Sequence, residues 1–146
     1  VSRAHPILLA HKEYPLLLTW MADEFLKAGH HKHAAAYYQT GSQLGQDNPV
    51  VLNNVAWVYA TNKDPAMRNG ALAVKYAMRS VQLTKGKNLG YFDTLAAAYA
   101  ENGDFEKAVG VITQALKRTD HKKSPDLAAS LNKSLLLYQQ RKPMRE

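Results

Sequence analysis

The sequence predicts an all-α protein made of repeated helix pairs. A pattern of large, large, small and large residues, at spacings of three, one and three, occurs three times along the chain. This spacing places the four side chains on one face of a helix. A second segment of helical periodicity, built around alanines, follows each copy, whereas no segment shows a strand pattern. The copies are Leu18, Met21, Ala22 and Phe25; Leu52, Val55, Ala56 and Tyr59; and Phe92, Leu95, Ala96 and Tyr99.

The first helix pair is expected at residues 15–28 and 31–44. Gly29 lies where a helix commonly ends in a left-handed residue. Residues 1–14 are a lead-in segment in which Pro6 could start a helical turn. Because Pro15 disfavours helical backbone at Tyr14, we expect the first regular helix to begin at about Pro15.

The second helix pair is expected at residues 49–61 and 70–83. A turn at residues 46–48 precedes it, and Pro49 occupies a position where a helix can start. The loop between the two helices, residues 62–70, is long and contains Asp64-Pro65 and Asn69-Gly70, which favour turns.

The third pair is expected at residues 91–102 and 105–118, joined by Gly103-Asp104. A last helix, residues 124–141, begins with Ser124 as N-cap and Pro125 at the first helical position. One side of this helix is apolar and predicts a cap over the third pair, while the other side is polar and should face water. The apolar residues are Leu127, Leu131, Leu135 and Tyr138; the polar ones are Asn132, Lys133, Gln139 and Gln140.

The three copies resemble the tetratricopeptide repeat (TPR), a helix–turn–helix unit of 34 residues. The small residues of the two helices in each unit are matched by Ala22 and Ala34, Ala56 and Ala73, and Ala96 and Ala108. Ala22 and Ala56 are 34 residues apart, and the alanines of the first and third units are each 12 apart. The alanines of the middle unit are 17 apart, so that unit has five extra residues between its helices.

The resemblance implies a right-handed α-solenoid of three TPR helix pairs plus a C-terminal capping helix. The expected parts are a lead-in (1–14), three repeats (15–48, 49–88 and 89–123), a capping helix (124–142) and a tail (143–146). Residues 52–57, 90–99 and 137–143 resemble a bacterial subgroup whose array often forms the C-terminal part of a larger protein. The resemblance implies a bacterial protein, either cytoplasmic or periplasmic. Since no signal-peptide pattern follows Val1, we also expect a piece of a longer protein.

Composition narrows the class of protein. Of 146 residues, 46% are hydrophobic, which favours a packed core, and no apolar run approaches the 18 residues of a membrane span. Cysteine is absent, which excludes disulfides, thiolate nucleophiles and cysteine-bound metals. The net charge is +7, with much of the excess after Lys117; a solvated basic surface or binding to nucleic acid or anionic lipid would both explain it.

The first helices of a TPR array line its concave groove, which implies a binding site for a peptide there. By helical phase the candidates are Thr19, Trp20 and Asp23; Asn53, Asn54 and Trp57; and Asp93, Thr94 and Ala97. An asparagine such as Asn53 can pair with a peptide backbone. Trp57 fits either a binding anchor or a packing role between helices.

The charges of these positions predict what kind of peptide would bind. Some TPR domains hold a peptide carboxylate with lysine, arginine and asparagine, but these positions include Asp23 and Asp93, and Lys27 is the nearest basic residue. A neutral or basic peptide is therefore expected, and a chaperone-type carboxylate clamp is disfavoured.

Metal binding and catalysis have little support. His30 and His33 are three residues apart and are weak metal candidates, because no nearby carboxylate or cysteine completes a site; with His31 they more simply form an exposed turn. No nucleophile elbow or phosphate loop is present. The acidic residues near Gly103, which are Glu101, Asp104 and Glu106, are expected to be solvated. We expect no enzyme, no cofactor and no small-molecule substrate.

Three functions remain from the sequence. The first is a protein-interaction scaffold that binds a peptide or partner helix in the groove. The second is a structural module that packs against its parent protein or forms a homodimer through apolar terminal residues at 7–9 and 16–18. The third is binding of nucleic acid or an anionic surface by the basic C-terminal part.

Overall fold

A computed structural model describes residues 14–146 and shows an all-α architecture, which confirms the predicted class. The described chain forms seven α-helices and one 3-10 turn, without a strand. They are α2 (Tyr14–Lys27), α3 (His31–Leu44), α4 (Pro49–Thr61), η1 (Pro65–Met67), α5 (Gly70–Leu83), α6 (Gly90–Glu101), α7 (Phe105–Arg118) and α8 (Pro125–Gln139). The expected lead-in turn at Pro6 and the apolar residues at 7–9 lie outside the described residues.

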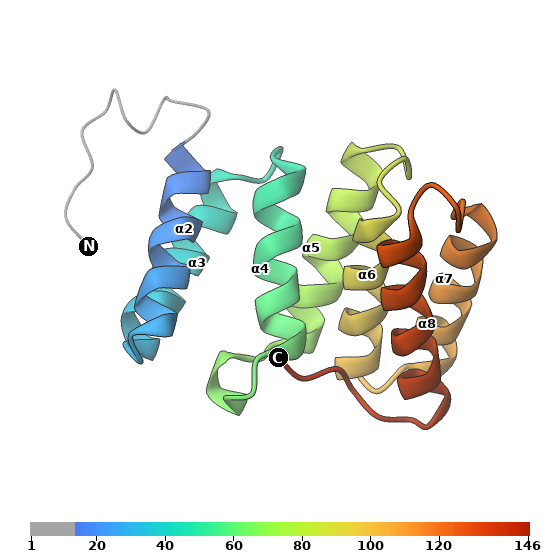
Figure 1. The fold of residues 1–146 in the computed structure, drawn as a ribbon. Helices are drawn as coiled ribbons and strands as arrows, with labels where there is room; N and C mark the ends of the chain where they lie inside the picture. The colour runs from blue at the N-terminus through green and yellow to red at the C-terminus, as the bar shows by residue number, and fades with distance from the viewer. Residues whose placement is uncertain (1–13) are drawn as a thin grey trace.

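Neighbouring helices pack as successive pairs in a row (Figure 1). α2 packs against α3, α4 against α5, and α6 against α7, while α4 and α5 both contact α6. α8 packs against α7 and also reaches α6. No helix between residues 14 and 146 combines the length and apolar content needed to cross a bilayer.

The six alanines of the repeated pattern are buried where the paired helices meet. Ala22, Ala34, Ala56, Ala73, Ala96 and Ala108 have no exposed surface. Gly41 has the same role in the first pair, because a Cβ atom there would lie 2.9 Å from the Thr19 methyl group on α2. Small residues therefore set how closely each pair of helices approaches.

An aromatic row joins the first helix pair to the second. Tyr38 of α3 meets Tyr59 of α4 edge to face, and Tyr59 lies beside Tyr76 of α5, with ring centroids 6.4 Å apart in both pairs. The Ser42 hydroxyl donates a hydrogen bond to the Tyr76 hydroxyl at 3.4 Å. Burial raises the pKa of Tyr59 to about 12, as expected for a phenol removed from water.

Most helix boundaries agree with the sequence prediction. α3, α4, α5 and α7 begin and end at the expected residues, whereas α2 and α6 each begin one residue early. α2 includes Tyr14 because proline is tolerated in the first helical turn. α8 stops at Gln139; Ser124 is its N-cap residue and Pro125 its first residue, as predicted, although the Ser124 side chain makes no capping bond.

Glycines end the first helix of the first and third pairs. Gly29 and Gly103 have φ angles of +78° and +82°, in the left-handed region. The amide of the next residue bonds back across the helix end, from His30 to the Phe25 carbonyl and from Asp104 to the Tyr99 carbonyl. This is the Schellman arrangement, and it confirms the predicted role of Gly29.

Gly103→Ala should lower the free energy of unfolding by about 1 kcal/mol, because an alanine is strained at positive φ. A Cβ atom there would meet nothing within 4 Å, so the effect isolates the backbone. Gly110→Ala is the matched control: this site in α7 is also open, and alanine should stabilise the helix by roughly 0.5–1 kcal/mol. Urea unfolding measures both, and effects of the same sign would contradict this account.

Candidate functional site

The last four residues, Pro143–Glu146, form a tail that returns from α8 to the C-terminal end of α4 (Figure 1). Met144 is buried with the core residues, at 8% exposure. The tail is thus packed onto the helices rather than extending into solvent.

Main-chain hydrogen bonds hold the end of the tail. The Glu146 N–H donates to the Thr61 carbonyl at 2.8 Å, and the Lys63 N–H donates to the Glu146 carbonyl at 3.2 Å. The main chain of Glu146 thus both donates to and accepts from the backbone at the end of α4 and just beyond it. Pairing of this kind is how an extended peptide adds to exposed backbone.

Two side chains add specific contacts with α4. The Trp57 indole Nε1–H donates to a carboxylate oxygen of Glu146 at 2.8 Å. The Arg145 guanidinium donates to the Ala60 carbonyl at 3.4 Å. Trp57 is half-buried, so its ring packs on its neighbours while its polar edge binds the tail.

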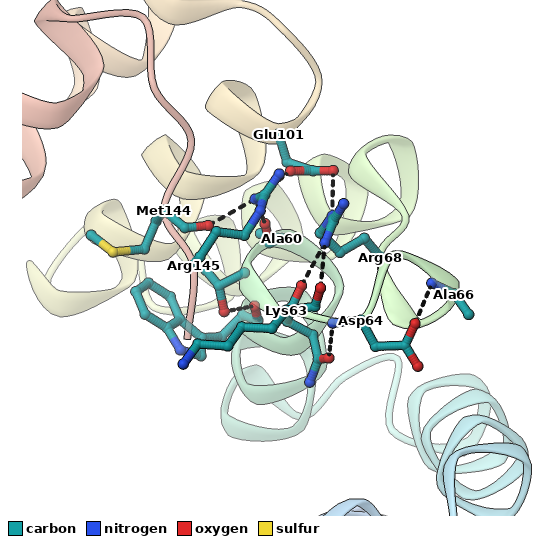
Figure 2. A network of polar contacts seen from close by, with 11 residues as sticks. Ala60, Lys63, Asp64, Ala66, Arg68, Glu101, Met144 and Arg145 are labelled. Atoms are coloured by element: carbon teal, nitrogen blue, oxygen red, sulfur yellow. Dashed lines mark hydrogen bonds and ion pairs between the residues drawn. The ribbon is translucent and has the colours of Figure 1, made fainter.

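The Glu101 carboxylate at the end of α6 lies between two arginines (Figure 2). Nε of Arg68 donates to Oε1 at 3.0 Å, and Nη1 of Arg145 lies 2.7 Å from Oε2. The Glu101 side chain is only 15% exposed, so the prediction that it is solvated is wrong. Both partners are distant in sequence, and no local pattern near Gly103 indicated them.

The loop between α4 and α5, residues 62–69, positions Arg68; we call it the insertion loop. Nη1 of Arg68 donates to the carbonyls of Asn62 at 2.8 Å and Lys63 at 3.2 Å. These bonds fix the backbone at Lys63, with which Glu146 pairs. We call Trp57, Ala60, Thr61, Lys63, Arg68 and Glu101 together the tail-binding surface.

A carboxylate holds the start of η1 and links the insertion loop to the first helix pair. Asp64 accepts a hydrogen bond from the Ala66 N–H at 2.9 Å and contacts the His31 ring of α3. These two interactions hold the pKa of Asp64 below its usual range, the Ala66 bond being the larger cause. The loop is therefore anchored at both ends.

The three candidates in α2 occupy different surroundings. Thr19 is buried against Gly41 and donates to the Leu16 carbonyl at 3.0 Å, so it does not line an open surface. Trp20 is 60% exposed. Asp23 is half-buried and accepts a hydrogen bond from the Tyr38 hydroxyl at 2.5 Å.

The candidates in α4 lie at or beside the tail-binding surface. Trp57 binds Glu146, while Asn54 is exposed and Asn53 is half-buried. Oδ1 of Asn53 is buried and has no hydrogen-bond partner, although its amide nitrogen lies 3.5 Å from Asn54 Oδ1. Asn53 therefore retains the capacity to accept one more hydrogen bond.

The candidates in α6 are buried, and α8 covers Asp93. Asp93, Thr94 and Ala97 are buried, so they do not form the exposed surface expected from helical phase. The hydroxyls of Ser134 and Ser130 donate to the Asp93 carboxylate at 2.8 and 3.1 Å. Desolvation raises the pKa of Asp93 against the opposing effect of these bonds.

The histidines near the start of α3 are an aromatic cluster. The rings of His30 and His33 are 6.0 Å apart edge to face, and Phe25 stacks on His33 at 5.2 Å. Within residues 14–146 no group of three or more potential ligands is placed to hold a metal ion.

Some of the positive charge of the C-terminal half is used inside the protein. The Arg118 guanidinium lies over the Phe92 ring and donates to the Gly86 carbonyl at 2.7 Å. Arg141 lies over the Phe105 ring, 5.3 Å from its centroid. Arg118 therefore packs against α6, and Arg141 packs against α7.

Neither the scan against protein-family models nor the search of curated proteins found a match to this chain.

Arg68→Ala should destabilise the fold more than Arg145→Ala, by roughly 2 against roughly 1 kcal/mol, because Arg68 also bonds two carbonyls of the insertion loop. Arg79→Ala is the control, since it removes a solvent-exposed pair with Asp47 and should cost below about 0.5 kcal/mol. Thermal and urea unfolding of the three variants rank the effects. A larger loss for Arg145→Ala would contradict the proposed role of the insertion loop.

Proposed function

We propose that the chain is a non-enzymatic TPR scaffold that binds an extended peptide on its tail-binding surface. In this proposal the three helix pairs form a right-handed solenoid, α8 caps it, and the surface lies in the concave groove. The repeated motif, the buried alanines and the order of helix packing support it.

The observation that supports peptide binding most directly is the bound tail. Main-chain bonds to Thr61 and Lys63 accept any sequence, whereas Trp57 and Glu101 contact particular side chains. Peptide-binding surfaces use this combination, with backbone pairing for affinity and side-chain sites for specificity. Arg68 and Glu101 of the surface are held in an ion pair, which suits recognition better than proton transfer.

In the structure, Glu101 rather than Asp93 is the acidic residue available to an expected basic ligand. Asp93 is covered by α8, so it does not meet a peptide in this conformation. Glu101 takes its place as the anionic group, because it receives the guanidinium of Arg145. A ligand with an arginine is thus favoured over a neutral one.

Selection of phage-displayed random decapeptides on the full chain, both wild-type and with Arg145→Ala to loosen the tail, should enrich peptides that bind at Trp57. In ¹⁵N-labelled protein the indole N–H of Trp57 gives its own NMR signal, which a Trp20→Phe variant distinguishes from that of Trp20. Enriched peptides should shift the Trp57 signal, because this N–H contacts the bound segment. The absence of enriched peptides, or an unchanged Trp57 signal at saturation, would count against the proposal.

Self-association is the second candidate function, and exposed apolar side chains on α2 favour it. Leu17 and Trp20 are 47% and 60% exposed and lie three residues apart on the same helix. If α2 pairs with a second copy, Trp20→Ser should convert a dimer to a monomer in light scattering at high concentration. A monomeric wild-type chain would exclude this candidate.

A further inference from the structure

We propose that the tail is an internal ligand of the tail-binding surface, and that a partner peptide with an apolar residue, an arginine and an acidic residue in succession displaces it. The proposal rests on the peptide-binding function proposed above and specifies its ligand. It follows from treating residues 144–146 as a bound peptide.

Each of these three residues occupies a different subsite. Met144 is buried among the core residues, Arg145 meets the Glu101 carboxylate, and Glu146 accepts the Trp57 indole N–H. The order along the chain is therefore apolar, cationic and acidic. The main-chain bonds of Glu146 fix the register but require no particular side chain.

The surface remains electrostatically balanced when the tail leaves. Arg68 still pairs with Glu101, so no carboxylate loses its last cation. Arg68 also keeps its bonds to the insertion loop, and the Thr61 hydroxyl keeps its bond to the Trp57 carbonyl. The insertion loop is therefore held by contacts that do not involve the tail, while the carbonyls of Ala60 and Thr61 become free to accept from a partner peptide.

The connection between α8 and the tail is conformationally disfavoured. Arg141 has a φ angle of +56°, in the left-handed region where a residue with a Cβ atom is strained. Bonds from Arg141 and Lys142 back to the carbonyls of Tyr138 and Leu137 hold this turn. This is the arrangement described above for Gly29 and Gly103, so the end of α8 sets the bend that leads into the tail, whether or not the tail is bound.

A tethered tail competes strongly with a free peptide. A segment on a short linker acts at an effective concentration of about millimolar, so the wild-type chain should bind the partner peptide weakly. A change that loosens only the tail should therefore strengthen binding of a free peptide that supplies its own arginine.

The test uses a fluorescein-labelled, amidated peptide with the sequence of residues 140–146, added to full-length variants and followed by anisotropy. Arg145→Ala should bind this peptide at least about tenfold more tightly than the wild-type chain, because the tail loses its ion pair with Glu101. Arg79→Ala removes another arginine that bonds a carboxylate and a carbonyl, and should leave the affinity unchanged. The same peptide with alanine at the position of Arg145 should not bind.

Glu146→Ala is the second variant, because it frees the tail from Trp57 without changing Glu101. It should also strengthen peptide binding, and thermal unfolding verifies that both variants are folded. Equal affinity of the wild-type chain and both variants for the tail peptide would overturn the proposal.

The phage-selected peptides separate this proposal from the proposed function. If they bind the wild-type chain and Arg145→Ala equally well, the tail does not compete and only the internal-ligand proposal fails. If no peptide binds any of the variants, both fail. A wild-type dimer that Arg145→Ala makes monomeric would show that the tail of a second copy occupies the surface. This result would overturn the proposal of a separate partner peptide.

Discussion

The carbonyls at the C-terminal end of α4 are the constraint on which the site depends. The last four carbonyls of a helix have no partner within it and must be satisfied from outside. Here the amides of Asn62 and Asn69 bond to the carbonyls of Val58 and Tyr59, and the Arg145 side chain and the Glu146 amide bond to those of Ala60 and Thr61. The insertion loop supplies the first two donors and the tail the last two. The helix end thus determines where both segments lie.

Glu101 then joins these two segments to the third helix pair. A carboxylate that is 15% exposed needs compensating charge, and Arg68 and Arg145 provide it from the insertion loop and the tail. The C-terminal dipole of α4 also favours cations at this position. Two guanidinium groups can therefore share one carboxylate beside the carbonyls of a helix end.

The sequence predicted the helices well because their signals are local. Alanines at fixed spacings identify the paired helices, and Pro49 and Gly29 mark helix ends by their own backbone preferences. The site depends instead on contacts over long separations, such as Arg68 with Glu101 and Trp57 with Glu146. Helical phase placed Asp93 on the outer side of α6, but it does not say what covers that side.

The small number of tail residues in the core favours an exchangeable ligand over a permanent part of the fold. Only Met144 is buried, whereas Arg145 is half-buried and Glu146 is exposed. Main-chain and charged contacts at such positions exchange with water at modest cost. The insertion loop matters in the same way, because its Arg68 bonds Glu101 directly. In the proposed function, the surface is thus formed before a peptide binds, which limits the ordering cost to the peptide.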